Sequence, residues 1–170
     1  MKYLVFDKTL HTEYTFLQLS KTFTSFESLF KDTDDEHLIE VAPYIFLVPE
    51  DWTLLIQANT HIKLQHVLII DSNANLHDFR IHLQQFIYQQ INKQLYYFRI
   101  WDGYVLKKFL PTCHIEQLRL MYKHIEHIRF EDWQQNSCMD FVVQNAKVKV
   151  ETKSLNITKE RIQAPNDALL

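Results

Sequence analysis

The chain has 170 residues, of which 46% are hydrophobic and 23% charged; this balance excludes a disordered protein and allows one domain with a hydrophobic core. Its net charge of −3 disfavours a general nucleic-acid-binding protein, because such proteins carry an excess of basic residues that contact phosphates. No apolar run approaches the ~20 residues that a membrane-spanning helix requires, so we expect no membrane segment.

The first half of the chain predicts strands and helices in alternation. Residues 3–7 and 44–48 are short apolar runs of strand length, and a helix is expected over residues 13–21 with Thr12 as its N-cap. Residues 66–70 read HVLII, a run that is apolar on both faces. Such a run is typical of a strand in the middle of a sheet that helices cover on both sides.

Two further helices are predicted on either side of this strand. One begins near Trp52 and turns Leu55, Ile56 and Ile62 inward. The other covers residues 75–91, where apolar side chains recur mostly three and four residues apart.

An aromatic strand, a charged turn and two helices then follow in one run. Aromatic and apolar side chains occupy both alternating faces of residues 96–101, so we predict a central strand there. Asp102 begins the turn, Pro111 ends the first helix, and Thr112 can cap the next one over residues 114–125. The alternation of strands and helices predicts an α/β fold, with a mixed or largely parallel sheet flanked by helices.

The end of the chain is predicted to be a small extension of the main domain. Residues 126–130 are predicted to form a strand. Residues 142–158 alternate over a long polar stretch, as in an edge strand whose lysines prevent pairing with another chain. Residues 159–170 are expected to be a loose tail. We therefore divide the chain into an α/β domain over residues 1–130 and a C-terminal extension over residues 131–170. The extension is an edge strand with a tail, or a reduced second lobe.

The chain has one glycine, Gly103, where an average usage of ~7% would give about twelve. Loops that cradle phosphates need glycine so that backbone N–H groups can approach the ligand closely. A Walker loop, a dinucleotide-binding fingerprint and a glycine-flanked nucleophile elbow are therefore excluded. We predict no cofactor.

Histidines offer the first candidates for a metal site. His124 and His127 lie three residues apart near a helix end, and Cys113 and His114 precede them. No carboxylate completes a recognised ligand pattern, so we predict ordinary surface histidines and no metal.

Strand-end acids offer the second candidate site. Asp7 and Asp71 both follow apolar strands and would lie at one edge of the sheet, where α/β proteins often bind ligands. We favour helix capping for both acids, and the alternative is a small hydrolase or ligand-binding domain that uses them. We assign no catalytic residue. Ser72, Cys113 and Cys138 could act as nucleophiles, but none of them lies in a sequence motif that activates a nucleophile.

Blocks of the sequence resemble, in order, the motifs of the bacterial type VI secretion effector adaptors, known as the Tap/Tec chaperone family and long catalogued as a domain of unknown function. The signature blocks read YFRIWD at residues 97–102, VL at 105–106, FLP at 109–111 and QL at 117–118. The upstream blocks are YLVFD at 3–7, SLF at 28–30, APY at 42–44, LV at 47–48, and Leu76, His82, Leu83 and Phe86 in the long helix. Two motifs differ from the family's pattern. The family's Asp-Pro is Asp102-Gly103 here, and MYKH at 121–124 stands where the family has Phe-Gly-Pro.

The resemblance implies an adaptor, without catalytic activity, that binds an effector toxin and loads it onto a VgrG-type spike protein. It implies an α/β lobe followed by a smaller helical lobe. Arg99 and Asp102 would organise the strand-to-helix turn, with Pro111 closing the helix that follows. We place the partner-binding surface where aromatic and basic residues gather around that turn. Its residues are Trp101, Tyr104, Lys107 and Lys108.

We expect a cytoplasmic protein. The first residues lack the long apolar core and cleavage site of a secretory signal, and two cysteines are too few for a disulfide framework. A third hypothesis, besides the adaptor and the ligand-binding domain, is an immunity protein that blocks the active site of a toxin.

Overall fold

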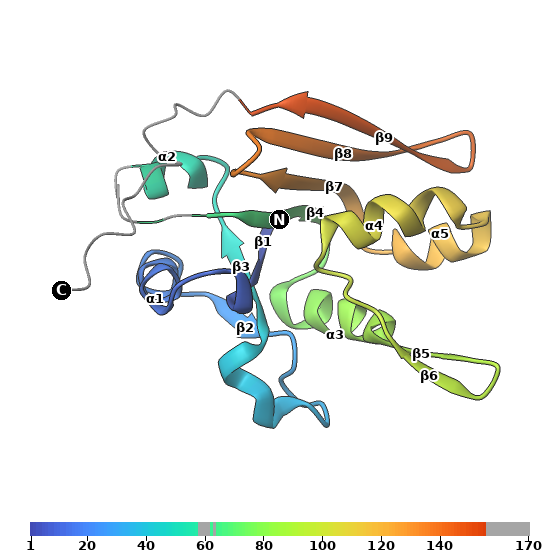
Figure 1. The fold of residues 1–170 in the computed structure, drawn as a ribbon, viewed down its shortest axis with the longest axis horizontal. Helices are drawn as coiled ribbons and strands as arrows, with labels where there is room; N and C mark the ends of the chain where they lie inside the picture. The colour runs from blue at the N-terminus through green and yellow to red at the C-terminus, as the bar shows by residue number, and fades with distance from the viewer. Residues whose placement is uncertain (58–61, 63, 156–170) are drawn as a thin grey trace.

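The computed structural model describes residues 1–57, 62 and 64–155. Within them, a seven-stranded sheet runs in the order β2-β3-β1-β4-β7-β8-β9 (Figure 1). Its strands are β1 (Lys2–Asp7), β2 (Phe26–Ser28), β3 (Pro43–Val48), β4 (His66–Ser72), β7 (Ile125–Asp132), β8 (Ser137–Gln144) and β9 (Lys147–Ser154). A separate hairpin is formed by β5 (Tyr88–Ile91) and β6 (Gln94–Tyr97).

The predicted mixed or largely parallel sheet is wrong, because every pairing in the seven-stranded sheet is antiparallel. The apolar runs that suggested parallel strands are buried for another reason, which is that helices cover both faces of the central strands. On β1, Tyr3 stacks on Phe79 of one helix, and Phe6 packs against Phe16 of another. Burial on both faces therefore does not reveal strand direction.

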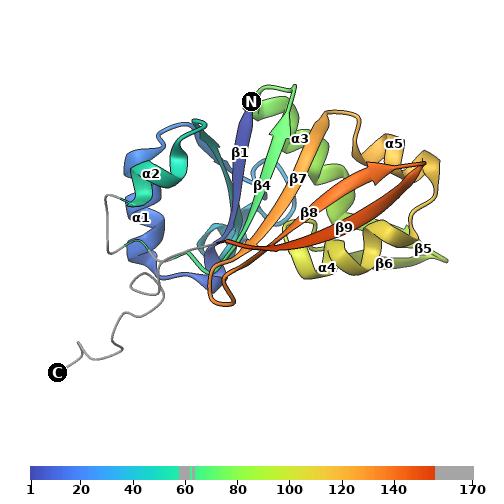
Figure 2. The ribbon, with the colours of Figure 1, turned by 90° about the horizontal axis from the view of Figure 1, so that it is seen from above.

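The helices lie on opposite sides of the sheet (Figure 2). Their bounds are α1 (Glu13–Thr22), α2 (Trp52–Gln57), α3 (Leu76–Ile87), α4 (Gly103–Phe109) and α5 (Ile115–Met121). α3, α4 and α5 cover one face, and α1 and α2 cover the other face near β1 and β3. Among the described residues, none of these helices has the length and apolar character needed to cross a membrane.

Strands β7 and β8 show how the two faces of the sheet differ. Ile128 and Phe130 of β7 pair with Phe141 and Met139 of β8, and all four side chains are buried in the core. The alternate residues of β7, with Arg129 among them, point to the opposite face. The boundary that we predicted at residue 130 falls inside β7, and β8 and β9 continue the same sheet. The tail predicted over residues 159–170 lies outside the described residues.

Local signals located several elements correctly. The helix over residues 13–21 is confirmed as α1, and the Thr12 hydroxyl accepts a hydrogen bond from the Thr15 N–H at 3.2 Å. The strands at residues 44–48 and 66–70 are confirmed as β3 and β4.

The helix that begins at Trp52 is confirmed as α2, with Ile56 buried on it. Leu55, predicted to face inward, is exposed, and Ile62 is buried beyond the end of α2.

The long helix begins where predicted, with Asn75 as its cap, but α3 ends at Ile87 and not at residue 91. Tyr88 has extended backbone angles and starts the hairpin strand β5. Asn92 and Lys93 both have positive φ, which matches a two-residue hairpin turn whose twist fits that of the flanking strands.

The central strand predicted over residues 96–101 is also wrong. β6 ends at Tyr97 and pairs only with β5, and its four residues are exposed. The cap predicted at Thr112 is wrong too, because His114 caps α5 through reciprocal hydrogen bonds with Gln117. Ile125, which we placed at the end of this helix, begins β7.

His11 is buried in its neutral form, with a backbone hydrogen-bond partner at each ring nitrogen. Its Nδ1–H donates to the Asp7 carbonyl at 2.7 Å, and its Nε2 accepts the Gln65 N–H at 3.0 Å. Burial, the largest cause, lowers the pKa of His11 to about 4, and Phe6 stacks on the ring at 4.1 Å. A proton on Nε2 would break the bond from Gln65.

This arrangement predicts a loss of stability in mild acid. The folded pKa lies below the unfolded value of ~6.5, so the contribution of neutral His11 is complete above pH ~6.5 and is lost as the pH falls towards 4. The shift corresponds to about 2–3 kcal/mol, after a discount for partial exposure of the ring. Urea unfolding at pH 7, 6, 5 and 4 measures it. His11→Gln, which does not titrate, should lose less stability than the wild type over this range, and equal losses would contradict the prediction.

Candidate interaction site

Asp7, the last residue of β1, is the centre of a buried polar junction. Its carboxylate accepts hydrogen bonds from the Thr9 N–H at 3.0 Å, the Thr9 hydroxyl at 2.6 Å, Arg99 Nη2 at 2.8 Å and the Trp101 indole N–H at 3.0 Å. We call Asp7, Thr9, Arg99 and Trp101 the Asp7 junction. It fastens the end of β1 to a segment more than ninety residues later in the chain.

The turn after the Asp7 junction is organised by Asp102. Its carboxylate accepts the backbone N–H groups of Tyr104 at 2.9 Å and Val105 at 3.3 Å, so it caps the N-terminus of α4. The Arg99 guanidinium lies 3.8 Å from the Asp102 carboxylate and nearer to Asp7. Pro111 is exposed and lies in the short 3-10 turn Leu110–Thr112 after α4.

The four residues that we assigned to a partner surface do not share one surface. Trp101 is only 7% exposed and packs edge-on against Phe30 and Tyr97. Tyr104 is half-buried; its hydroxyl donates to Asp132, and burial is the main cause that raises its pKa to about 12. Lys107 and Lys108 are exposed on α4. The aromatic side chains therefore point inward and the lysines outward.

The β5–β6 hairpin exposes three large side chains, two of which, Tyr96 and Tyr97, were predicted to lie in a central strand. Leu95, Tyr96 and Tyr97 are 71%, 47% and 48% exposed. The hairpin projects beyond the end of α3 (Figure 1). The sequence predicts a turn at Asn92-Lys93, but residues 88–91 before it were assigned to the long helix, and the alternating residues after it were interpreted as a core strand. The hairpin was therefore missed.

An apolar groove of about 420 Å³ lies beside β2 and β3. Phe16, Phe26 and Tyr44 form much of its lining, and Ile39 stands at its side. Leu38, Ile39 and Val41 are exposed along the neighbouring 3-10 segment Glu36–Val41, so this region also presents apolar surface.

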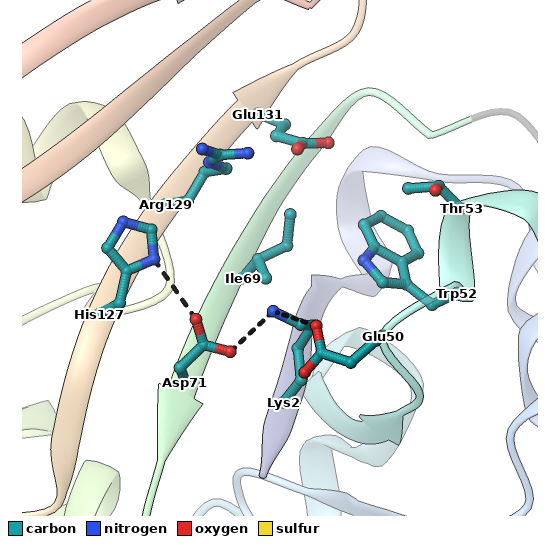
Figure 3. Close-up of a pocket in the computed structure, with 9 residues that line it drawn as sticks. All are labelled: Lys2, Glu50, Trp52, Thr53, Ile69, Asp71, His127, Arg129 and Glu131. Carbon is teal, nitrogen blue, oxygen red and sulfur yellow. Dashed lines mark hydrogen bonds and ion pairs between the residues drawn. The ribbon is translucent and has the colours of Figure 1, made fainter.

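A polar cavity of about 350 Å³ lies on the face of the sheet that α1 and α2 cover (Figure 3). At its lower end in the figure, Asp71 pairs with Lys2 at 2.8 Å and with His127 at 3.5 Å, and Lys2 also pairs with Glu50 at 3.2 Å. Asp7 takes no part in it. Because β1 and β4 are antiparallel, the strand ends that carry Asp7 and Asp71 lie at opposite ends of the sheet. The single ligand site that these two acids would have shared is therefore ruled out.

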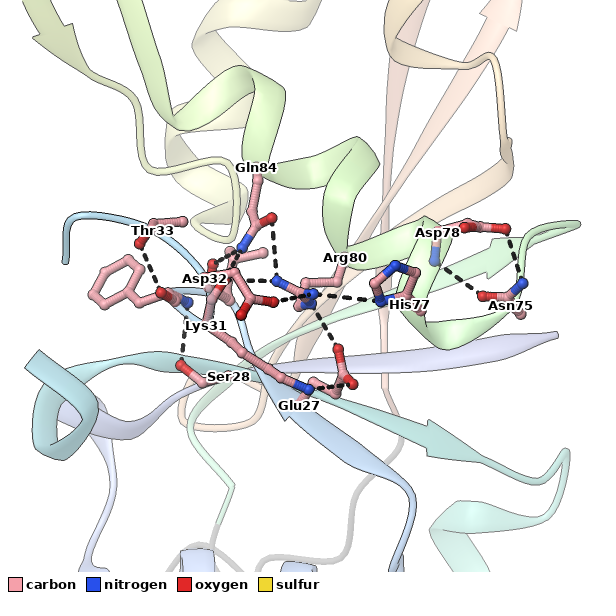
Figure 4. A network of polar contacts seen from close by, with 12 residues as sticks. Glu27, Ser28, Lys31, Asp32, Thr33, Asn75, His77, Asp78, Arg80 and Gln84 are labelled. Carbon is pink, nitrogen blue, oxygen red and sulfur yellow. Dashed lines mark hydrogen bonds and ion pairs between the residues drawn. The ribbon is translucent and has the colours of Figure 1, made fainter. Parts of the chain in front are cut away.

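A second polar network fastens α3 to the segment after β2 (Figure 4). Arg80 is fully buried, and its guanidinium donates to Glu27 at 2.6 Å, to Asp32 at 2.8 Å and to the Lys31 carbonyl at 2.6 Å. A buried guanidinium requires such partners. The contacts fix residues 27–32 against α3, which is a structural role.

The residues considered for catalysis have structural partners. The Ser72 hydroxyl donates to the His124 carbonyl and accepts the Ala74 N–H, so it stabilises a turn. Cys113 and Cys138 are buried free thiols, and burial raises the pKa of both. Within residues 1–57, 62 and 64–155, no three histidine, cysteine or acidic side chains are grouped as metal ligands.

Comparison with known proteins gives one match. No curated protein and no solved structure matches the chain significantly. The family described as "Domain of unknown function (DUF4123)" matches residues 2–120, which include the Asp7 junction, the hairpin and α4. Because this match covers more than half of the sequence, the chain belongs to the DUF4123 family.

Proposed function

We propose that the protein is an adaptor that binds a type VI secretion effector and loads it onto a VgrG-type spike protein. The observation that carries the proposal is the ordered set of adaptor-like motifs within the family match at residues 2–120. Two of those motifs, YLVFD and YFRIWD, meet in space at the Asp7 junction. The resemblance thus involves residues that build one structural unit.

The β5–β6 hairpin is the surface that we propose for the effector. It presents three large apolar or aromatic side chains on a projecting element, and such side chains contribute much of the binding energy of protein interfaces. Tyr97 also packs against Tyr88 and Trp101, which ties the hairpin to the Asp7 junction. Lys107 and Lys108 remain exposed on α4 as a second contact region.

The experiment that tests the adaptor function is a pull-down of the tagged protein from cells that encode it, with mass spectrometry of the co-purified proteins. Recovery of an effector together with a spike protein is the expected result. Recovery of a toxin through its catalytic domain, without the spike, would replace the adaptor by an immunity protein. Recovery of the chain alone would contradict both functions.

Substitutions in the hairpin should weaken effector binding without unfolding the protein. In the double variant Leu95→Ala/Tyr96→Ala, we expect the dissociation constant for the co-purified effector to rise about tenfold to a hundredfold, as when interface hot spots are truncated. The melting temperature should stay near that of the wild type, because both side chains are exposed. Leu54→Ala, at a 61% exposed leucine on α2, is the matched control. Unchanged affinity in the double variant would remove the hairpin from the interface.

A further inference from the structure

The polar cavity of Figure 3 contains cations that are already paired with acids. Lys2 contacts Asp71 and Glu50, as described above. Arg129 Nε donates to Asp140 at 2.8 Å, and His127 lies 3.2 Å from the same carboxylate. An anion entering the cavity would have to displace these carboxylates from their partners.

Glu131 differs from the other acids of this cavity, which are paired with cations. It is 7% exposed, and its carboxylate accepts the Trp133 indole N–H at 2.9 Å. Among the described residues, no lysine, arginine or histidine nitrogen forms an ion pair with it within 4.0 Å, although Arg129 is close enough to act at longer range. Burial is the largest cause that raises the pKa of Glu131, and a cation that reached the carboxylate would offset the cost of burying its charge.

Aromatic side chains lie beside Glu131. Trp52 is buried and lines the cavity, and Trp133 lies behind it with 6.5 Å between the ring centroids. In Figure 3, Glu131 and Thr53 lie at the end of the cavity that is away from the Asp71 pairs, with Trp52 along one side. Arg129 is drawn beside Glu131 and pairs with Asp140. A cation that entered this end of the cavity would meet the Glu131 carboxylate and the small exposed part of the Trp52 ring, and both attract positive charge.

We propose that this cavity binds an arginine side chain of a partner polypeptide, whose guanidinium lies against Trp52 and donates to Glu131. The planar guanidinium suits both contacts, because it stacks on aromatic rings and forms two parallel hydrogen bonds with a carboxylate. The cavity volume of about 350 Å³ is within the range of small-ligand pockets. The proposal does not depend on the adaptor function, since any polypeptide that presents the arginine would serve.

The test is a titration of the full-length, ¹⁵N-labelled protein with N-acetylarginine methylamide, followed by NMR. The indole N–H signals of Trp52 and Trp133 should shift saturably, while that of Trp101, which donates to Asp7, should stay in place. The corresponding citrulline derivative is a neutral probe of the same shape and should cause no saturable shift. Absence of saturable shifts with the arginine probe, or equal binding of citrulline, would overturn the proposal. Tighter binding of N-acetyllysine methylamide would overturn the assignment to arginine.

A matched pair of variants locates the bound probe. Glu131→Gln keeps an oxygen that can accept the Trp133 indole N–H, so it should fold and melt at or above the wild-type temperature. It should bind the arginine probe about tenfold more weakly or worse, because the charged acceptor is gone. Glu151→Gln removes a carboxylate from β9 that does not line the cavity and should bind like the wild type. Wild-type affinity in Glu131→Gln would refute the site even if the adaptor function were confirmed.

Discussion

Gly103→Ala is expected to destabilise the protein by about 3 kcal/mol or more, at the upper end of what overpacking costs. Gly103 begins α4 at the point where this helix touches β7. A Cβ built at this position would overlap Cγ and Cδ2 of the Phe130 ring and lie 2.6 Å from its Cβ, whereas real Cβ atoms essentially never approach below 3.0 Å. The chain's only glycine therefore permits the close contact between helix and sheet.

Phe130 has little freedom to move away. It is 1% exposed, and the rings of Tyr104 and His66 pack on it at 5.1 Å and 5.6 Å between centroids. Relief would require α4 to shift, and with it the Asp102 cap. Close packing in the interior makes such shifts costly.

Urea unfolding measures the effect of Gly103→Ala. Lys107→Ala, at an exposed position of the same helix, is the control and should stay within ~0.5 kcal/mol of the wild type. In a Phe130→Ala background, the substitution at Gly103 should cost much less, because the overlapping ring is gone. A wild-type midpoint for Gly103→Ala alone would show that α4 does not pack on β7 as described.

Local chemistry predicted the elements of this fold better than their arrangement. The Thr12 cap and the compact runs at residues 44–48 and 66–70 are signals carried by a few neighbouring residues, and α1, β3 and β4 follow them. Strand direction depends instead on which strands become neighbours. β1 lies between β3 and β4, a placement that no local pattern encodes. This is why Asp7 and Asp71 were expected at one edge and are found at opposite ends.

The candidate site was predictable only in part for the same reason. The Asp102 carboxylate caps α4, a local role that its position before a helical pattern already suggests. The partner of Arg99 and Trp101 is Asp7, which is too distant in sequence to be inferred from spacing. Since that partner binds the Trp101 indole, an aromatic residue beside a polar turn is found in the interior. The exposed aromatic side chains lie instead on the β5–β6 hairpin, which comes before Trp101 in the chain.

The second large effect is expected at Asp7, because four hydrogen bonds converge on its carboxylate. Asp7→Ala should lower the free energy of unfolding by about 2–4 kcal/mol. The main cause is that the buried Trp101 indole N–H loses its acceptor, and the Thr9 backbone N–H loses its acceptor as well. The ion pair with Arg99 adds little, since the arginine side chain is 43% exposed.

The order of three variants distinguishes a junction centred on Asp7 from a general effect of removing charge. Arg99→Ala should cost clearly less than Asp7→Ala, because Asp7 would keep its bonds to Thr9 and Trp101. Asp71→Ala removes a carboxylate that lies near the surface, and should cost less than ~1 kcal/mol. Urea unfolding of all three at pH 7 gives the order. If Arg99→Ala were as harmful as Asp7→Ala, the exposed ion pair would hold the junction together, and the buried indole bond would contribute little.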